Sequence, residues 1–312
     1  MTSIPGAGLV RTGAARVVDA ALPRLGGLPA YLSAVRAITP GRSPVARRAR
    51  VSLSLLPSAQ HSDLVVQAEP VEFRYLSVPG DDLQFACRLG LVGWEPTARW
   101  LFRLLAAESR SVVDVGAYSG IYSITAALAN PDCRVLAIEP NPAMAALARA
   151  NVAANALDDR VDVLQVALAT ADGTAELVLP TGAPESSLAS LVATGDGERI
   201  PVQTRRLDDV AGEEGVDLIK IDVESGEPGV LAGGADVLAA NEPVILMEAL
   251  TPEELAGQRT LLAAHGYADP VVVNSATRSD ARMFAWATAR RSPLLLAGLE
   301  EARRQVASRR RR

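Results

Sequence analysis

The fold is decided by an apolar run that ends in two glycines, Ser111-Val112-Val113-Asp114-Val115-Gly116-Ala117-Tyr118-Ser119-Gly120. Residues 111–117 have the composition of a buried β-strand, and residues 121–128 have that of a helix. Gly116 and Gly120 allow the backbone to turn sharply between the two elements. This stretch therefore predicts a strand, a turn and a helix of an α/β sheet.

The alternation of strand and helix continues downstream of this glycine turn. It predicts βαβ units with right-handed crossovers, and hence a doubly wound, mostly parallel sheet. One of the helices begins with a capping box formed by Thr251 and Glu254. Strands are predicted at 134–139, 161–168, 175–179, 200–205, 216–223 and 244–248, helices at 142–155, 229–238 and 252–264, and a closing hairpin at 271–274 and 283–287.

The less regular ends of the chain suggest a division into three regions. Residues 1–92 are expected to form a cap or an oligomerisation extension, because their apolar segments are too short to form a core alone. Residues 93–290 are expected to form the main domain, and residues 291–312 a basic helical tail that ends in arginines. Outside the regular region, helices are predicted at 14–22, 30–38 and 96–107, and a pair of strands at 71–75 and 83–87.

The composition excludes several classes of protein. The net charge of −5 gives no overall attraction to nucleic acid or to an anionic membrane surface. No uncharged run is long enough to span a bilayer, and the first residues lack the pattern of a signal peptide. The two cysteines do not make a disulfide framework. We therefore expect a cytoplasmic protein with no nucleic-acid partner and no stable membrane insertion.

The glycine turn has two interpretations. Ligands bind at the carboxyl edge of doubly wound sheets, and glycines let the backbone approach a ligand closely. The spacing differs from the Gly-x-Gly-x-x-Gly of dinucleotide enzymes, because only Gly116 and Gly120 are present, with Asp114 two residues before the first. A ligand without phosphates but with a charged amino-acid end fits this spacing better. An ordinary tight turn between strand and helix is the alternative.

Glu139 closes the next predicted strand, about twenty residues beyond Gly120. An acidic residue at this place can accept hydrogen bonds from both ribose hydroxyls of a nucleoside. A helix-capping or solvated role is the alternative. Because S-adenosylmethionine and nicotinamide dinucleotides both contain ribose, Glu139 does not distinguish between them.

The predicted strand at 216–223 leads into a charged segment that contains the only lysine of the chain, Lys220. Side-chain alternation places Lys220, Asp222 and Glu224 on one face. Ionisable groups on a buried strand are costly unless they are paired or used. Lys220 is therefore predicted to be buried and to pair with Asp114, Asp222 or Glu248. The pair would either orient a functional carboxylate or be purely structural.

At these residues the chain resembles the FkbM family of methyltransferases. The matching motifs are the 113–120 turn, the 220–227 strand end, the 243–248 strand, Glu139-Pro140 and Gly93-Trp94-Glu95-Pro96. The resemblance covers residues 93–286, and Ser225 stands where the family usually has glycine. It implies a Rossmann-like class I methyltransferase fold with seven strands, S-adenosylmethionine as cofactor, and O-methylation in natural-product or polysaccharide assembly.

The motifs and the resemblance together give the expected site residues. Asp222, and then Glu224, are the candidate catalytic residues, because a carboxylate can take the proton of a hydroxyl group. Glu95 and Glu248 are expected to bind the acceptor, and Lys220 to orient a carboxylate. No residue is assigned as a metal ligand, and no structural zinc site is predicted, since no cluster of His, Cys and Asp has ligand spacing. A metal ion held by the carboxylates of the site stays an open alternative. Cofactor binding is expected at Asp114, Gly116, Tyr118, Gly120, Glu139 and Asp222.

We therefore expect an S-adenosylmethionine-dependent O-methyltransferase that acts on a hydroxyl of a small molecule, natural product or sugar. Contact between copies in a homo-oligomer is one role left open for residues 1–92. Two alternatives to the methyltransferase stay open. One is a nicotinamide-dependent oxidoreductase on a related fold, and the other is a non-catalytic partner protein that keeps the methyltransferase fold.

Overall fold

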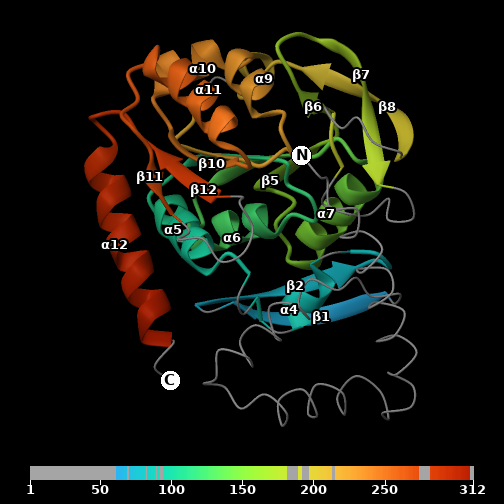
Figure 1. Cartoon of the computed structure of the whole chain (residues 1–312). Helices are drawn as coiled ribbons and strands as arrows, with labels where there is room; N and C mark the ends of the chain where they lie inside the picture. Colours follow the sequence, from blue (N-terminus) through green and yellow to red (C-terminus); the bar gives the residue numbers. More distant parts are fainter. Residues whose placement is uncertain are drawn as a thin grey trace, which may run out of the picture. The chain divides into compact units, whose positions relative to one another are not determined.

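The computed structural model of the chain describes residues 61–68, 70–81, 83–88, 90–91, 94–180, 189–191, 197–212, 215–273 and 282–309 (Figure 1). The chain divides into two compact units, Met1–Trp94 and Glu95–Arg312. The helices predicted at 14–22 and 30–38 and the last three arginines lie outside the described residues. Among the residues described, no helix is both long and apolar enough to cross a membrane.

The described part of the first unit is a two-stranded antiparallel sheet followed by a short helix. Strand β1 (Ser62–Ala68) pairs with β2 (Val71–Ser77), and α4 spans Gln84–Arg88. The strand predicted at 83–87 was wrong, since this segment is α4 and the partner of β2 lies upstream. The side chain of Asp81 explains the helix, because its Oδ1 atom accepts a hydrogen bond from the amide of Leu83 (2.9 Å) and so starts the helical turn.

The second unit is built on a seven-stranded sheet with the order β11-β12-β10-β9-β3-β4-β5 (Figure 1). The five strands from β10 to β5 are parallel, and β12 is antiparallel to both β10 and β11. The predicted doubly wound, mostly parallel α/β sheet is therefore confirmed. The bounds are β3 Ser111–Val115, β4 Arg134–Ile138, β5 Val161–Leu164, β9 Leu218–Ile221, β10 Val244–Ala249, β11 Val271–Val272 and β12 Arg282–Trp286.

Strand β3 lies inside this sheet, between β4 and β9. The chain connects β3 to β4 through one helix, whereas β9 follows about a hundred residues later. The order of the strands thus reverses at β3, and such a switch point leaves room for a ligand beyond the carboxyl ends of the strands. The glycine turn follows β3 directly and so occupies this position.

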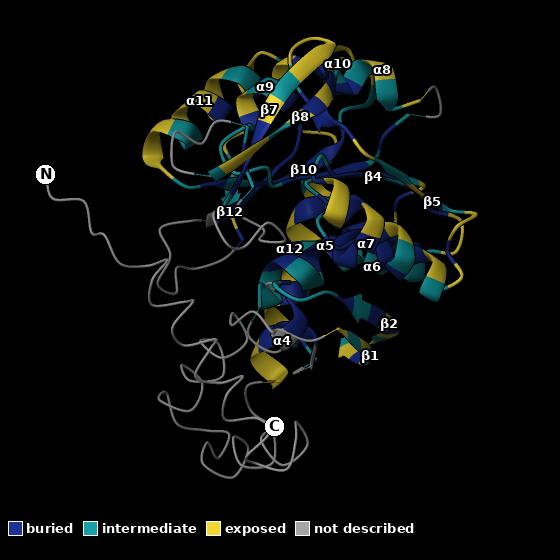
Figure 2. Ribbon diagram, turned by 90° about the vertical axis from the view of Figure 1, so that its right-hand side faces the viewer, coloured by how far each residue is buried: buried dark blue, intermediate teal, exposed yellow. Residues whose placement is uncertain are grey.

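Helices cover both faces of the sheet, as Figures 1 and 2 show. Helices α5 (Pro96–Ala107), α6 (Ile121–Ala129) and α7 (Pro142–Ala154) lie on one face. Helices α9 (Glu227–Ala232), α10 (Ala235–Asn241) and α11 (Pro252–Ala263) lie on the other. Apolar strand residues such as Val113, Ile219 and Ile245 pack in one core cluster with this second layer. The predicted capping box of Thr251 and Glu254 is present at the start of α11.

Two predicted elements are each divided in the structure. The strand predicted at 161–168 becomes β5 and β6 (Ala167–Leu168), and β6 joins a separate sheet with β7 (Gly173–Pro180) and β8 (Gly197–Arg205). A continuous apolar run gives no signal where a chain leaves one sheet for another. The helix predicted at 229–238 becomes α9 and α10, separated at Gly233, where a Cβ atom would lie 2.1 Å from the carbonyl oxygen of Ala169.

Helix α12 (Ser292–Arg309) packs against α5 along its apolar side, which includes Leu295, Leu299 and Ala302. A Cβ atom at Gly298 would contact the Leu101 side chain at 3.2 Å, so the two helices approach closely. The described part of the region 291–312 is therefore mainly a helix that packs against α5 within the second unit. The boundaries predicted at 92/93 and 290/291 stay predictions.

The packing of α12 predicts that Leu299→Ala lowers the free energy of unfolding by about 2–5 kcal/mol, because it leaves a cavity in the α5–α12 contact. Urea unfolding followed by circular dichroism measures the loss. Leu296→Ala is the matched control on the same helix, since the Leu296 side chain is 53 % exposed and its truncation should change stability by less than about 0.5 kcal/mol. Equal, small effects of both substitutions would contradict the packing.

Candidate active site

The glycine turn brings the end of β3 against the end of β9. Gly116 has a φ of +76°, and a Cβ atom there would lie 1.9 Å from the carbonyl oxygen of Asp222. Glycine is therefore required at 116 by the protein's own backbone, and contact with a cofactor at this position stays a prediction. Tyr118 and Gly120 also have positive φ angles, of 52° and 86°. The turn thus folds back tightly before α6 begins.

Glu139 is 7 % exposed and fixes this turn from the end of β4. Its Oε2 atom accepts a hydrogen bond from the Tyr118 amide (2.8 Å), and its Oε1 atom accepts one from the Asn141 amide (2.9 Å). Burial raises the pKa of Glu139 to about 7, although these two hydrogen bonds favour the charged form. Each carboxylate oxygen has capacity for one further donor, as recognition of two ribose hydroxyls requires.

Lys220 is 3 % exposed and forms the centre of a charged network. Its Nζ atom lies 3.2 Å from Asp222 Oδ2, 3.9 Å from Asp114 Oδ1 and 4.9 Å from the centroid of the Tyr122 ring. Burial alone would lower the pKa of Lys220, but the charges of Asp222 and Asp114 raise it above its ordinary value. The predicted pairing is thus confirmed for Asp114 and Asp222, and the role of the pair stays a prediction.

Asp114 is fully buried in β3 beside Lys220. Its Oδ2 atom accepts a hydrogen bond from Ser123 Oγ (2.7 Å), a residue of α6 that the sequence motifs did not identify. Burial raises the pKa of Asp114, whereas Lys220 and Ser123 favour its charged form. The carboxylate therefore connects β9, β3 and α6 in the interior.

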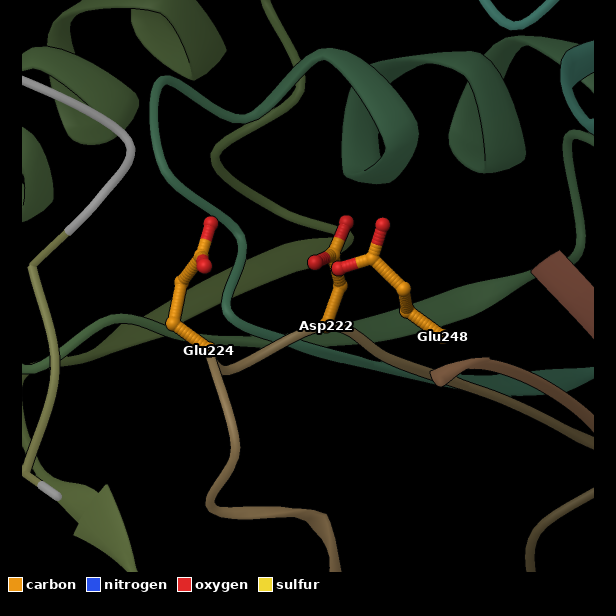
Figure 3. A group of neighbouring side chains, drawn as sticks. All are labelled: Asp222, Glu224 and Glu248. Atoms are coloured by element: carbon orange, nitrogen blue, oxygen red, sulfur yellow. The ribbon is translucent and has the colours of Figure 1, made fainter. Parts of the chain in front are cut away.

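Asp222, Glu224 and Glu248 form an acidic cluster at the carboxyl edge of β9 and β10, and one carboxylate oxygen of each lies within 4.8 Å of the others. Figure 3 shows the three side chains projecting to the same side, with Asp222 and Glu248 nearest to each other. Burial and the charges of Asp222 and Glu224 raise the pKa of Glu248 to about 9. Three carboxylates in this arrangement could bind a cation or the hydroxyl groups of a ligand.

The acidic cluster stands on a turn with unusual backbone angles. Glu224 and Ser225 both have positive φ, 54° and 79°, which explains why the resembling family usually has glycine at the second position. Ser225 Oγ donates a hydrogen bond to Glu254 Oε1 (2.9 Å), and Ser190 Oγ donates one to the Glu224 carbonyl (2.7 Å). The sequence did not identify Ser190, and it gave Ser225 only as a departure from the family's glycine, because the hydrogen-bond partners of both serines are distant along the chain. They fix the turn despite its strain.

The turn also settles the place of Glu227, which begins α9 and is buried. Its Oε1 atom accepts a hydrogen bond from the Val223 amide (3.2 Å), so the carboxylate closes the turn that carries Glu224 and Ser225. Ser225 in place of glycine therefore leaves a compact turn.

Glu95 reaches the same region from the residue before α5, where its φ of 36° is left-handed. Its Oε2 atom accepts a hydrogen bond from the hydroxyl of Tyr122 (2.5 Å). Burial and the charge of Asp222 raise the pKa of Glu95, and Lys220 and Tyr122 lower it. Glu95, Asp222 and Glu248 thus influence one another electrostatically, as expected of residues at one site. Tyr122 was not identified from the sequence, because its partner is 27 residues away.

The sheet order, the turn at the switch point and the carboxylates beyond β4, β9 and β10 define a class I methyltransferase fold. The sequence model of the methyltransferase FkbM domain family matches residues 114–268, which include the glycine turn, Glu139, Lys220 and the acidic cluster. Over these residues the chain belongs to the FkbM methyltransferase family.

Similar proteins include the 2-O-methyltransferase NoeI of Sinorhizobium fredii, which is 28 % identical over 157 residues. The alignment covers 45 % of this chain and 63 % of that protein, so the chain spans less than two thirds of this relative.

Two solved structures have a similar fold. Methyltransferase FkbM from Methylobacillus flagellatus KT is 16 % identical with a TM-score of 0.44, over 57 % of this chain and 44 % of that chain. An O-methyltransferase from Bacillus cereus in complex with SAH is 16 % identical with a TM-score of 0.39, over 63 % of this chain and 81 % of that chain.

The network around Lys220 predicts that Lys220→Met costs about 3–5 kcal/mol of unfolding free energy, because it leaves buried Asp114 without its cation. Lys220→Arg should also lower the melting temperature, since a planar guanidinium does not fit a compact site built for an ammonium. Differential scanning calorimetry measures both. Arg304→Met, which removes an exposed ion pair of α12, is the control and should leave the melting temperature unchanged. If Lys220→Arg had the melting temperature of the wild type, a positive charge alone would be sufficient for the stability of this network.

Proposed function

We propose that this protein transfers the methyl group of S-adenosylmethionine to a hydroxyl of a small molecule, natural product or sugar. The observation that carries the proposal is the ion pair of Lys220 with Asp222 beside Glu248, at the sheet edge where a ligand of this fold binds. The name of the relative NoeI, a 2-O-methyltransferase, supports oxygen as the methylated atom. The proposed partner of the protein is therefore its small-molecule acceptor. We also propose that the protein has no nucleic-acid partner and no stable insertion into a membrane.

The residues of the glycine turn fit the proposed cofactor. Glu139 keeps one acceptor site on each oxygen for the ribose hydroxyls, and the turn from Gly116 to Gly120 presents backbone beside it. Asp114 Oδ1 is buried 3.9 Å from the Lys220 ammonium, so Asp114 supports the turn from the interior, and its contact with the cofactor stays a proposal. When bound, S-adenosylmethionine supplies a methyl group that is already activated by its sulfonium.

The acidic cluster then performs the chemistry at the acceptor. Asp222 takes the proton that the acceptor hydroxyl loses as its oxygen bonds to the methyl group. The ammonium of Lys220, 3.2 Å away, holds the carboxylate of Asp222 in place. Glu248, with its pKa raised to about 9, carries a proton at neutral pH and donates a hydrogen bond to a neighbouring oxygen of the acceptor. Glu95 and Glu224 bind further hydroxyls from either side.

The family match disfavours the alternative of a nicotinamide-dependent oxidoreductase, because the matched family is one of methyltransferases. The glycine turn also lacks the spacing of dinucleotide-binding enzymes. A non-catalytic partner protein would keep the cofactor site but lack turnover. The distinguishing assay supplies S-adenosylmethionine with a labelled methyl group and a panel of methyl glycosides and polyhydroxylated alcohols. An O-methylated product, located by NMR, supports the proposal, and cofactor binding with no transfer to any acceptor contradicts it.

Asp222→Asn should lower kcat about 100-fold or more, because an amide cannot accept the acceptor proton. The labelled-methyl assay measures the rate, and calorimetry with S-adenosylhomocysteine tests whether the site is still formed. Asp162→Asn is the matched control, since Asp162 is an exposed aspartate of β5 and should be neutral. Full activity of Asp222→Asn would assign the proton transfer to another group, with Glu224→Gln the next variant to test.

The raised pKa of Glu139 predicts that cofactor affinity depends on pH. The charged carboxylate accepts hydrogen bonds from ribose, and with a pKa of about 7 it is mostly protonated at pH 6 and mostly ionised at pH 8. The Kd for S-adenosylmethionine should therefore fall by about tenfold between these pH values. Isothermal titration calorimetry measures it. Glu139→Gln should bind more weakly and with a flat pH profile, whereas a pH dependence unchanged in this variant would point to another group.

A further inference from the structure

Tyr122 connects the glycine turn to the acceptor side of the site. It lies in the first turn of α6, two residues beyond Gly120, and its side chain is buried. Its hydroxyl donates the hydrogen bond of 2.5 Å to Glu95, and its ring packs edge-on against Phe102 of α5, with 4.8 Å between the centroids. The ammonium of Lys220 lies over the face of the same ring. One side chain therefore contacts two of the charged groups of the site.

Glu95 stands in an unfavourable position, where it accepts the hydrogen bond of Tyr122. Its backbone is left-handed, which is unfavourable for a residue with a side chain, and its carboxylate is repelled by Asp222. The charged and titratable groups that face it are Lys220 of β9, Asp222 directly after β9, Glu248 of β10, Arg99 of α5 and Tyr122 of α6. The Tyr122 hydroxyl is the group for which the structure shows a direct hydrogen bond to the carboxylate.

Tyr122 is suited to be a permanent donor in this contact. Burial and the charge of Glu95 raise its pKa well above the ordinary value of a tyrosine, so its hydroxyl keeps its proton throughout the neutral range. A donor that cannot ionise favours the charged form of Glu95 and holds one of its oxygens in place. The other oxygen of the carboxylate can then point in a fixed direction.

We propose that Tyr122 is a positioning residue for the acceptor: its hydroxyl holds the Glu95 carboxylate at the acidic cluster, and its ring holds the Lys220 ammonium toward Asp222. The inference rests on the proposed methyl transfer to a hydroxyl and extends it to a residue outside the expected site. It implies that acceptor recognition depends on α6, the helix that begins at the glycine turn. Tyr122 itself touches neither the acceptor nor the methyl group.

The first test needs no acceptor. The protein is labelled with 13C at the glutamate side-chain carboxyls, and the resonance of Glu95 is assigned from its loss in Glu95→Gln. Tyr122→Phe keeps the ring and removes only the hydroxyl, so it should raise the pKa of Glu95 in an NMR titration. Tyr267→Phe is the matched control, because the buried Tyr267 hydroxyl donates to the Pro243 carbonyl (2.8 Å) outside the site. An unchanged Glu95 titration in Tyr122→Phe overturns the proposal.

The second test uses methyl glycosides that the wild-type protein methylates. Tyr122→Phe should raise the KM for the acceptor and lower kcat/KM about tenfold at pH 7. The acid limb of the pH profile of kcat/KM should move to higher pH. The Kd for S-adenosylhomocysteine should stay within twofold of wild type, about the precision of such a comparison. Tyr267→Phe should lower the melting temperature by about as much as Tyr122→Phe does, without moving the pH profile of kcat/KM. A pH profile of Tyr122→Phe that coincides with that of Tyr267→Phe overturns the proposal.

Absence of transfer by the wild-type protein would contradict the proposed function, while the NMR titration still decides the role of Tyr122.

Discussion

The buried ammonium of Lys220 is the constraint on which the rest of the site depends. It lies in the central part of the sheet, where β9 runs beside β3, and it contacts Asp114 of β3 and Asp222, the residue directly after β9. Removing one partner of a buried ion pair leaves an uncompensated charge, which is far more costly than losing an exposed pair. The register of β9 against β3 is thus coupled to charge pairing as well as to apolar packing. Asp222, the group proposed for proton transfer, forms its ion pair with this same ammonium.

The backbone around Lys220 is arranged to bring acidic groups close together. Gly116 allows the end of β3 to lie against the carbonyl of Asp222, and the left-handed Glu224 and Ser225 turn the chain back immediately after it. Such conformations persist only when surrounding contacts hold them, and here hydrogen bonds to Ser190 and Glu254 do so. Burial, together with repulsion from Asp222 and Glu224, then raises the pKa of Glu248 to about 9, which favours its protonated form at neutral pH. Neighbouring carboxyl groups can therefore act as acceptor and donor at the same time.

The sequence predicted the parallel sheet and the pairing of Lys220 because both depend on local patterns. The apolar runs around Asp114 and Lys220 have the period and flanks of buried strands, and an ionisable residue on such a strand needs a partner. The helix at α4 was missed because its start depends on the Asp81 side chain, and the division of 161–168 because both pieces are equally apolar. Tyr122 and Ser190 were missed, and the hydrogen bond of Ser225 was not predicted, because their partners come from distant parts of the chain. Hydrogen bonds of this kind have no signature in a single sequence.

The contact between α5 and α12 has a consequence for the order in which the protein is completed during synthesis. Glu95 stands at the start of α5, whereas the helix that packs along α5 is the last element of the described chain. On the ribosome, the strands that carry Asp222 and Glu248 emerge before α12 does. The apolar side of α5 stays uncovered until α12 has also left the exit tunnel. A nascent chain therefore exposes this apolar surface after the strands of the site have emerged and before α12 can cover it.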